Sequence, residues 1–332
     1  MSVGRELALL SVVAPVYEEE ASIERFCETV AQALSGLPYE LIMVDDGSTD
    51  GTQAKLVRLA AADDRIKLVL LSRNFGHQAA ITAGLDSASG NVAVTLDSDL
   101  QDPPGVIPQL LDRWRAGADV VYAVRRRRAG ESRFKLGTAH WFYRLFHGLT
   151  SVNLKDNTGD FRLLDRHALD ALMSMRERSR FLRGMSIWVG FTQDSVAYDR
   201  DARYAGETKF TLHRMVRFSL DAITAFSYRP LQLATLLGFL ISSIAFLAVP
   251  VVIVLKITGH YLHGFSTVEI TMLLLGGIQL ITIGLIGEYV GRIFDEVKGR
   301  PLYLVRSREN FTDAAGPTSA YEEAAADFDA ER

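Results

Sequence analysis

The chain has 332 residues, 48% of them hydrophobic and 23% charged, with a formal net charge of −4 at pH 7. These values are typical of a globular protein, and so small a net charge gives no support for binding nucleic acid. The one cysteine, Cys27, excludes an intrachain disulfide. The slightly positive mean hydropathy fits a globular domain that carries a few membrane helices.

Short apolar runs alternate with helical patterns over the first 123 residues. The apolar runs predict strands at 9–14, 40–44, 67–71, 91–96 and 119–123. Helical spacing predicts helices between them at 20–35, 49–61, 77–88 and 104–115. Strands and helices that alternate at this pitch indicate an α/β fold, with a mostly parallel sheet covered by helices on both faces.

Polar residues follow three of these strands, at 15–18, 45–48 and 97–99. In an open α/β sheet, ligands bind at the carboxyl ends of the strands. Asp45 and Asp46 could accept hydrogen bonds from a base or from ribose hydroxyls. Asp97 and Asp99 offer the hard oxygens that Mg²⁺ or Mn²⁺ prefers, and such an ion could neutralise a diphosphate leaving group. Each motif alone also suits an ordinary turn, but the three together predict a nucleotide site.

The chain becomes basic at 125–128, a run that suits either a solvated face or contact with phosphates and anionic headgroups. The pattern beyond it predicts an aromatic helix at 134–149, a polar loop at 153–166, a helix to about 175, late strands near 187–189 and 195–198, and a helix at 211–228. The last of these is amphipathic, so we expect it to lie on a membrane surface. Packing on the domain is the alternative.

Two apolar segments follow, at 231–255 and 270–287. The first is uncharged for 25 residues, which exceeds the roughly 20 that span a bilayer as a helix. Basic residues lie on the outer flanks and the connecting loop is short, so the positive-inside rule predicts both termini in the cytoplasm. The acidic tail lacks periodicity, and we expect disorder from about 307.

Several motifs of this chain resemble those of GT-A-fold, family 2 glycosyltransferases. They lie at 15–18, 44–48, 97–104, 157–162, 206–209 and 287–292. More narrowly, the chain is similar to the polyprenyl-phosphate glycosyltransferases, which comprise dolichol-phosphate mannose synthases and bacterial bactoprenol glucosyltransferases. The resemblance spans roughly residues 8–305 and includes both apolar segments.

The resemblance implies a multi-pass protein of the inner (plasma) membrane that acts in the cell envelope. A cytoplasmic GT-A catalytic domain is expected at 1–205, an amphipathic interfacial region at 206–229, and two transmembrane helices within 230–292, at about 231–255 and 268–290. Residues 293–332 would form a cytoplasmic C-terminal segment. Relatives suggest a homotetramer.

The resemblance also implies roles for individual residues. The nucleotide pocket would comprise Pro15, Tyr17, Glu19, Val44, Asp46, Asp97 and Ser98. Metal and donor diphosphate would be held by Asp97, Asp99 and Gln101. The acceptor phosphate would meet Arg125 and Arg133. The catalytic set would comprise Asp99, Asp160, Arg125, Arg203 and Lys209, the last two closing over the diphosphate.

Asp160 is the base that the resemblance suggests, but a phosphate acceptor does not need one. The second pKa of a phosphate monoester is about 6, so the acceptor is mostly dianionic at neutral pH. We therefore expect Asp160 to orient the acceptor or to support Arg162 and the metal, and Asp160→Asn to slow turnover only modestly.

The reaction expected from the resemblance is inverting transfer of a hexose, glucose from UDP-glucose above all, to undecaprenyl phosphate, with Mg²⁺ or Mn²⁺. A GDP-mannose or aminosugar donor is an alternative within the same class. A processive polysaccharide synthase is disfavoured because the chain has no Gln-x-x-Arg-Trp motif. A non-catalytic membrane scaffold is the alternative of another class, and the intact Asp97 and Asp99 pair argues against it.

Overall fold

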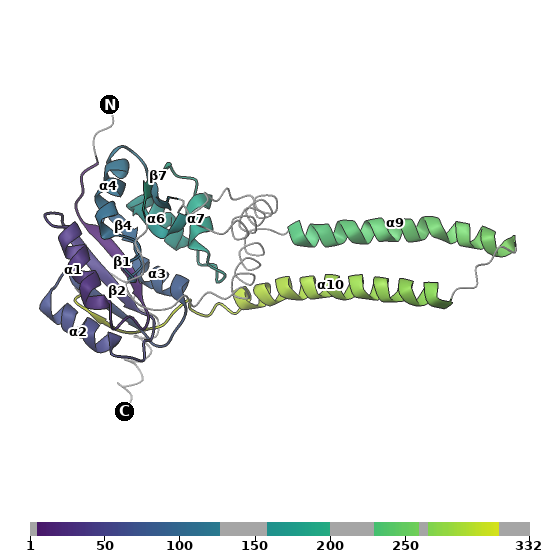
Figure 1. Cartoon of the computed structure of the whole chain (residues 1–332), viewed down its shortest axis with the longest axis horizontal. Helices are drawn as coiled ribbons and strands as arrows, with labels where there is room; N and C mark the ends of the chain where they lie inside the picture. Colours follow the sequence, from purple (N-terminus) through teal and green to yellow (C-terminus); the bar gives the residue numbers. More distant parts are fainter. Residues whose placement is uncertain (1–4, 127–157, 200–228, 259–264, 312–332) are drawn as a thin grey trace. The chain divides into compact units, whose positions relative to one another are not determined.

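The computed structural model describes residues 5–126, 158–199, 229–258 and 265–311 (Figure 1). By its internal contacts the chain divides into two compact units. The first comprises 1–133, 154–209 and 301–332, and the second comprises 134–153 and 210–300. The predicted aromatic helix and almost all of the predicted interfacial region lie outside the described residues.

The first unit is built on a mixed sheet of eight strands in the order β7-β5-β6-β4-β1-β2-β3-β8. The strands are β1 (Leu10–Val16), β2 (Tyr39–Asp45), β3 (Ile66–Leu71), β4 (Val92–Thr95), β5 (Val120–Arg125), β6 (Thr158–Asp165), β7 (Gln193–Tyr198) and β8 (Val305–Glu309). Pairs within β4-β1-β2-β3 are parallel, as is β5 with β7. The predicted α/β fold with a mostly parallel sheet is therefore confirmed.

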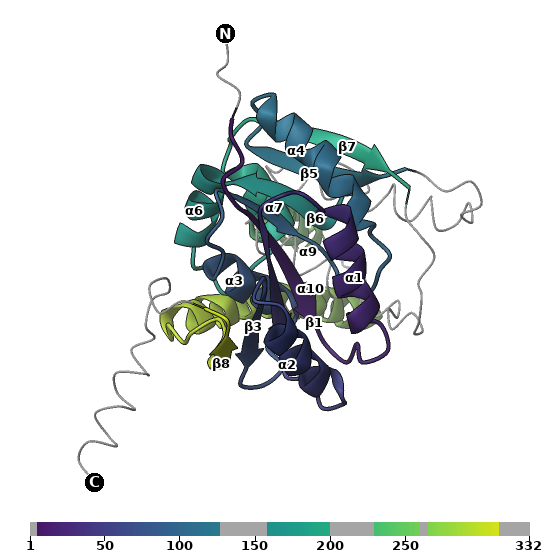
Figure 2. The ribbon, with the colours of Figure 1, turned by 90° about the vertical axis from the view of Figure 1, so that its left-hand side faces the viewer.

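Helices cover both faces of this sheet (Figure 2). On one face lie α1 (Ile23–Ala33), α2 (Thr52–Ala62) and α4 (Ile107–Arg115), the last preceded by a 3₁₀ turn, Pro104–Val106. On the other lie α3 (His77–Asp86), α6 (Arg166–Ser174) and α7 (Leu182–Trp188). The helical spacing of α1 buries Ile23, Phe26 and Val30 completely against the strands. Burial of such side chains contributes roughly 1.5–3 kcal/mol each.

Helix α3 lies unusually close to the sheet because Gly84 has no side chain. A Cβ atom at Gly84 would lie 2.3 Å from Val13 Cγ1 of β1. This close packing matters for the site, because the first residues of α3 lie where the central strands end.

Strand β6 corrects the prediction of a polar loop at 153–166. The segment was expected to be a loop because charged residues interrupt its apolar ones. In the structure Asp160 and Arg162 pair with each other at 3.0 Å, and Asp165 caps α6 by accepting a hydrogen bond from His167 N at 3.0 Å. With those charges paired, the segment enters the sheet antiparallel to β4 and β5. Residues 187–189, expected as a strand, instead form the end of α7 and its C-cap.

Strand β8 corrects the predicted start of the disordered tail at about 307. It pairs antiparallel with β3 and adds an outermost strand to the sheet beside β3. Asn310 fixes its far end by donating to the carbonyls of Ala60 and Ile66, at 2.6 and 2.9 Å. Just before the strand, the hydroxyl of Tyr303 donates to Asp86 Oδ2 at 2.7 Å. Pairing with β3 therefore orders a segment whose own sequence lacks an apolar pattern.

The described part of the second unit consists of two long helices that contact each other, α9 (Arg229–Ile257) and α10 (Phe265–Val297). Both apolar segments predicted from the sequence are thus helical. Among the described residues, one segment, Leu274–Val297, is long and apolar enough by length and composition to cross a membrane. The second predicted span stays a prediction.

Candidate active site

The acidic motif at 97–99 follows β4 directly, at the edge where the parallel strands β1, β2 and β4 end. The side chain of Asp97 is 26% exposed. Ser98 is buried and donates to the carbonyl of Pro15 at 2.9 Å, which ties the motif to the end of β1. Leu100, directly after Asp99, has a φ of 60°. Such a backbone costs about 1–3 kcal/mol for a non-glycine residue and persists only where its surroundings impose it.

Antiparallel pairing of β4 with β6 brings a second carboxylate to this edge. Thr95 is opposite Arg162 in the register, and its hydroxyl donates to the carbonyl of Asp160. The ring of His77, the first residue of α3, lies between the two acids. Its Nε2 is 3.5 Å from Asp97 Oδ1 and 3.5 Å from Asp160 Oδ2.

Three further side chains fix the carboxylate of Asp160. Arg183 approaches it with two nitrogens, Nε at 3.2 Å from Oδ1 and Nη2 at 3.0 Å from Oδ2. Arg162 Nη2 donates to Oδ1 at 3.0 Å, and Gln78 Nε2 donates to Oδ2 at 3.4 Å. Both oxygens are therefore engaged from more than one side.

The pKa values of Asp97 and Asp160 are shifted in opposite directions. Burial is the largest cause that raises the pKa of Asp97 to about 6, and the charge of Asp160 adds to it although His77 opposes it. Burial would also raise the pKa of Asp160, but the neighbouring cations, Arg183 first, hold that pKa well below its usual value. Asp160 is therefore an ionised carboxylate with little tendency to accept a proton.

A third arginine at the same edge is also paired with a buried carboxylate. Arg125, at the end of β5, donates through Nη2 to Asp102 Oδ2 at 3.0 Å and through Nε to the hydroxyl of Tyr198 at 3.0 Å. That hydroxyl in turn donates to the other oxygen of Asp102, which is fully buried. Gly159 makes room for the guanidinium, because a Cβ atom there would lie 2.9 Å from Arg125 Nη2.

Backbone amides hold the carboxylates after β2. Asp46 accepts hydrogen bonds from Phe75 N at 2.7 Å and from Gly76 N at 2.9 Å. Gly47 has a φ of 71°, and a Cβ atom there would lie 2.5 Å from the backbone carbonyl carbon of Arg73. Only glycine suits both conditions. The loop after β2 is thus packed tightly against the residues that lead into α3.

The glutamates after β1 are also engaged. Glu19 accepts from the Ser22 hydroxyl at 2.6 Å, and Glu20 accepts from Gly51 N at 3.1 Å. Glu18 accepts from the hydroxyl of Thr49 at 3.3 Å. All three link the first strand end to α1 or to the loop before α2, and Tyr17 beside them is exposed.

The residues at 97–101 suit a divalent cation. Carboxylate and amide oxygens form the hard donor set that Mg²⁺ and Mn²⁺ prefer. A cation beside Asp97 would offset the burial and, after it, the neighbouring carboxylate charges that raise the pKa of Asp97. Within the described ranges, no group of three or more His, Cys, Asp or Glu side chains is arranged to hold a metal ion. Mg²⁺ commonly binds one or two carboxylates together with substrate phosphates, and Asp97 and Asp99 fit that mode.

The structure brings several predicted site residues to one edge of the sheet, and these are Tyr17, Glu19, Asp46, Asp97, Ser98, Asp99, Gln101, Arg125 and Asp160. Pro15 and Val44 belong to the strands themselves and are buried there. Arg133, Arg203 and Lys209 lie outside the described residues. The individual roles given to all of these residues stay predictions.

Sequence reasoning missed four residues of the site, which are His77, Asp102, Arg183 and Tyr198. His77 could have been found, because it begins a predicted helix directly after Gly76, in the connection that follows the strand ending at Leu71. Asp102 lies within the motif 97–104. Arg183 and Tyr198 reach the site only through the fold, and no local pattern marks them.

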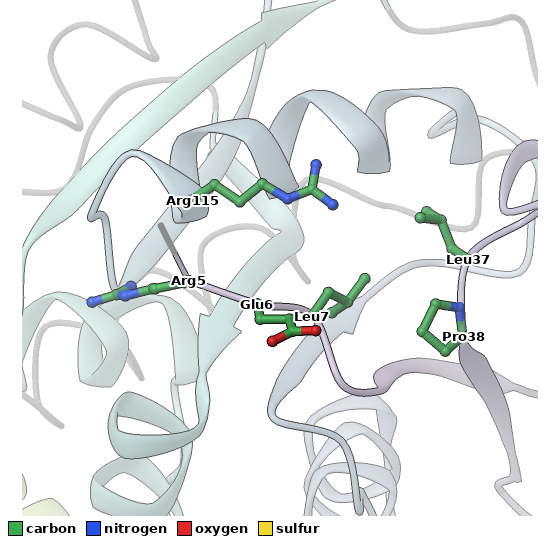
Figure 3. A pocket seen from close by; sticks show the side chains of 6 residues that line it. All are labelled: Arg5, Glu6, Leu7, Leu37, Pro38 and Arg115. Atoms are coloured by element: carbon green, nitrogen blue, oxygen red, sulfur yellow. The ribbon is translucent and has the colours of Figure 1, made fainter. Parts of the chain in front are cut away.

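A surface hollow of about 550 Å³ lies at the opposite edge of the sheet (Figure 3). It is lined by Arg5, Glu6, Leu7, Leu37, Pro38 and Arg115. These residues precede β1 and β2 or end α4. Arg5 is engaged there with the carbonyl of Ala118 at 2.7 Å and with Asp119 at 2.6 Å. The hollow is therefore separate from the strand-end carboxylates and is given no catalytic role.

The sequence of this chain is similar to those of known glycosyltransferases. A family model described as Glycosyl transferase family 2 matches residues 11–173. The chain is 46% identical over 299 residues to the uncharacterized glycosyltransferase YkcC of Bacillus subtilis, with 89% of this chain and 93% of that protein covered. It is 40% identical over 303 residues to the bactoprenol glucosyl transferase of Shigella phage SfX, with 90% and 99% covered.

Among solved structures, the chain is similar to glucosyl-3-phosphoglycerate synthase from Mycobacterium tuberculosis in complex with Mn²⁺, UDP-glucose and phosphoglyceric acid. The TM-score is 0.44 and the identity 22%, with 65% of this chain and 77% of that chain covered.

Proposed function

This chain belongs to glycosyl transferase family 2, and we propose that it transfers glucose from UDP-glucose to a polyprenyl phosphate such as undecaprenyl phosphate. The observation that carries the proposal is the 40% identity to a bactoprenol glucosyl transferase over 90% of this chain. Helices α9 and α10 have 29 and 33 residues. A match that covers 90% of this chain leaves out too few residues to exclude both helices. The similarity therefore extends beyond the catalytic unit to the part of the chain suited to a lipid acceptor.

The acidic motif is proposed to hold the donor diphosphate through a divalent cation, Mg²⁺ or Mn²⁺. Asp97 and Asp99 would bind the ion with Gln101 beside them, and the ion would stabilise the charge that develops on the leaving UDP. Tyr17, Glu19 and Asp46 are proposed to contact the nucleoside from the neighbouring strand ends. Pro15, Val44 and Ser98 would support that pocket.

The transfer is proposed to be a single displacement at the anomeric carbon. The bond from this carbon to the donor phosphate oxygen breaks and its electron pair leaves with UDP. A phosphate oxygen of the acceptor forms the new bond from the opposite face, so the configuration inverts. The acceptor oxygen is already ionised near neutral pH, because the second pKa of a phosphate monoester is about 6.

Asp160 does not need to act as a base in this reaction. Its low pKa and its ion pairs support a role in holding the cations of the site in place. This strengthens the expectation from the sequence that Asp160 supports Arg162. It also raises the expected cost of Asp160→Asn above the modest loss expected from the sequence, because the amide would leave two arginines without their carboxylate.

Arg125 is proposed to meet the acceptor phosphate. Its side chain is 28% exposed, and the buried carboxylate of Asp102 holds it from behind. A guanidinium held in this way is oriented before the phosphate arrives, so less side-chain freedom is lost on binding. Arg133, Arg203 and Lys209 are proposed to add positive charge around the two phosphates.

The C-terminal helices are proposed to anchor the protein in the inner membrane, with the catalytic unit and both termini in the cytoplasm. The apolar segment Leu274–Val297 supports membrane association. A second span through α9, an interfacial helix over 206–229 and a homotetramer are parts of the same proposal. The phosphate of a membrane lipid would then lie near the surface where a cytoplasmic sugar nucleotide can reach it.

The test incubates the purified full-length chain with undecaprenyl phosphate and labelled UDP-glucose, GDP-mannose or UDP-N-acetylglucosamine, with Mg²⁺ or Mn²⁺. The expected result is label in the lipid fraction from UDP-glucose, at a rate lowered at least about 100-fold by Asp99→Ala. If only GDP-mannose or only the aminosugar nucleotide gives labelled lipid, the proposed donor is that nucleotide sugar and not UDP-glucose. Failure to transfer or hydrolyse any donor would overturn the enzymatic proposal and favour a scaffold.

A further inference from the structure

Arg183 is the one arginine at Asp160 that is both paired with this carboxylate and substantially exposed, within the part of the chain that the structure describes. Its side chain is 32% exposed, whereas that of Arg162 is 3% exposed. The two nitrogens of Arg183 meet the two oxygens of Asp160 in a side-on pair. Such bidentate pairs fix the plane and direction of a carboxylate as well as its charge.

The helix that carries Arg183 is fixed from two directions. Gln78 Oε1 accepts from Leu182 N at 3.0 Å, which attaches the start of α7 to α3. Arg162 Nη1 donates to the Leu182 carbonyl at 2.8 Å and to the Ser186 hydroxyl at 2.6 Å, which attaches the same turn to β6. Arg183 is therefore delivered to Asp160 by a turn whose backbone has little freedom to move.

The other two partners of Asp160 do not fix its direction as well. Arg162 lies two residues away on the same strand, and the Nη2 that donates to Oδ1 also donates to the carbonyl of Gly159, while its Nη1 is bonded to α7. Gln78 approaches at 3.4 Å, near the outer limit of a hydrogen bond. Loss of Arg183 would thus leave Asp160 paired but free to rotate away from its contact with His77.

We propose that Arg183 is a positioning residue of the transfer reaction that acts through Asp160. It holds this carboxylate turned so that Oδ2 faces His77, which in turn lies against Asp97. The inference rests on the proposed function, since it concerns the rate of that transfer. It gives Arg183 no contact of its own with either substrate.

The test is a double-mutant cycle of Arg183→Gln and Asp160→Asn in the full-length chain, read as UDP release and lipid product. Each single change is expected to lower kcat about 10- to 100-fold, with the KM values for donor and acceptor changed by less than threefold. If Arg183 acts only through Asp160, the double variant is no slower than the slower single variant. Arg183→Lys is expected to recover part of the lost kcat, because an ammonium pairs with the carboxylate without fixing its plane.

Arg176→Gln is the matched control. Arg176 makes the same kind of two-bond pair with a carboxylate, that of Asp86, at 2.7 and 2.9 Å. This pair lies apart from the acidic motif, so kcat should stay within twofold of the wild type. If Asp160→Asn does not fold, the comparison of Arg183→Gln with Arg183→Lys decides, and equal kcat for the two overturns the inference.

Other outcomes separate the inference from the proposed function. Multiplicative losses in the double variant, or a raised acceptor KM at unchanged kcat, overturn the inference alone because Arg183 then acts independently. Non-additive losses with another donor or acceptor overturn the proposed substrates and support the inference. A wild-type protein without any turnover overturns both.

Discussion

Two sets of carboxylates lie at the same edge of the sheet and are held by different means. After β2, Asp46 is held by the backbone amides of Phe75 and Gly76. Beside β6 and β5, Asp160 and Asp102 are held by arginine side chains. The first arrangement fixes the path of a loop, whereas the second fixes the direction of charged groups.

The electrostatic consequences of the two arrangements are opposite. Burial raises the pKa of Asp46, and the two amides only partly offset it. Burial acts on Asp160 in the same direction, but Arg183 and the other cations reverse it and lower the pKa. An arginine compensates a buried negative charge more fully than a neutral amide does. The proposed function assigns the nucleoside to the amide-held side and the phosphates to the arginine-held side.

The largest effect on activity is expected at the acidic motif, 97–99. There the positive charge is proposed to come from a metal ion, and not from the backbone amides or the arginines that hold the other carboxylates. Asp99→Ala should lower kcat by about 10²- to 10³-fold, because the charge of the leaving diphosphate is then poorly stabilised. Removing divalent ions with EDTA should have a comparable effect on the wild type. Lipid-product assays measure both, and Asp112→Asn on the exposed side of α4 is the control. Full activity in EDTA would contradict the proposed metal.

The arginine-held side should be sensitive in stability as well as in rate. Arg162→Gln is expected to cost about 3 kcal/mol or more of unfolding free energy, because it removes a buried ion pair with Asp160 and the bonds from the guanidinium to Leu182 and Ser186. Denaturant unfolding of the catalytic unit within the full chain measures this cost. Arg65→Gln, which breaks an exposed pair with Asp63, should change stability little. Equal midpoints for the two variants would show that the buried pair does not stabilise the fold.

The amide-held side should be sensitive to backbone changes. Gly47→Ala is expected to cost about 2 kcal/mol or more, because it adds a clash with the backbone of Arg73 to the strain of a positive φ. Gly36→Ala is the matched control, since Gly36 has a φ of 82° and nothing within 4 Å of the added atom. The Gly47 variant should also bind UDP more weakly, which calorimetry measures. Equal effects of the two changes would argue against a tight loop.

The smallest effect is expected far from both sides, at the C-terminal segment. Tyr303→Phe removes one hydrogen bond to Asp86, which keeps both bonds from Arg176. The expected cost is about 1 kcal/mol of unfolding free energy, with kcat unchanged. Thermal unfolding and the lipid-product assay check the two halves of this expectation. A large loss of activity would mean that the segment affects the site.

The contrast between the two sides also explains what could be predicted from the sequence. Asp45, Asp46 and Asp97 follow strands that their own apolar runs predict, so both the sheet and the position of these acids were expected. Gln101 belongs to the same motif as Asp97. Local patterns suffice wherever a residue and the strand that positions it are neighbours in the chain.

The arginine-held side could not be predicted in this way. Asp160 is bonded to Gln78, which is 82 residues away in the chain, and to Arg183, which is 23 residues away. Strand β6 was expected as a loop because the sequence does not show that Asp160 and Arg162 pair with each other within the strand and with residues of α7. Strand β8 was expected as disorder because its pairing partner, β3, is more than 200 residues earlier. Only the resemblance to a known family indicated that Asp160 and Arg125 belong to the site.

The measurement that tests the central claim most directly is the identity of both products formed from UDP-glucose and undecaprenyl phosphate. Mass spectrometry of the lipid and chromatography of the nucleotide give both in one reaction. If the enzyme transfers the hexose without its phosphate, the products are a lipid monophosphate that carries one hexose and UDP. A lipid diphosphate that carries the hexose, released with UMP, or UDP without any lipid-linked hexose, would contradict the account.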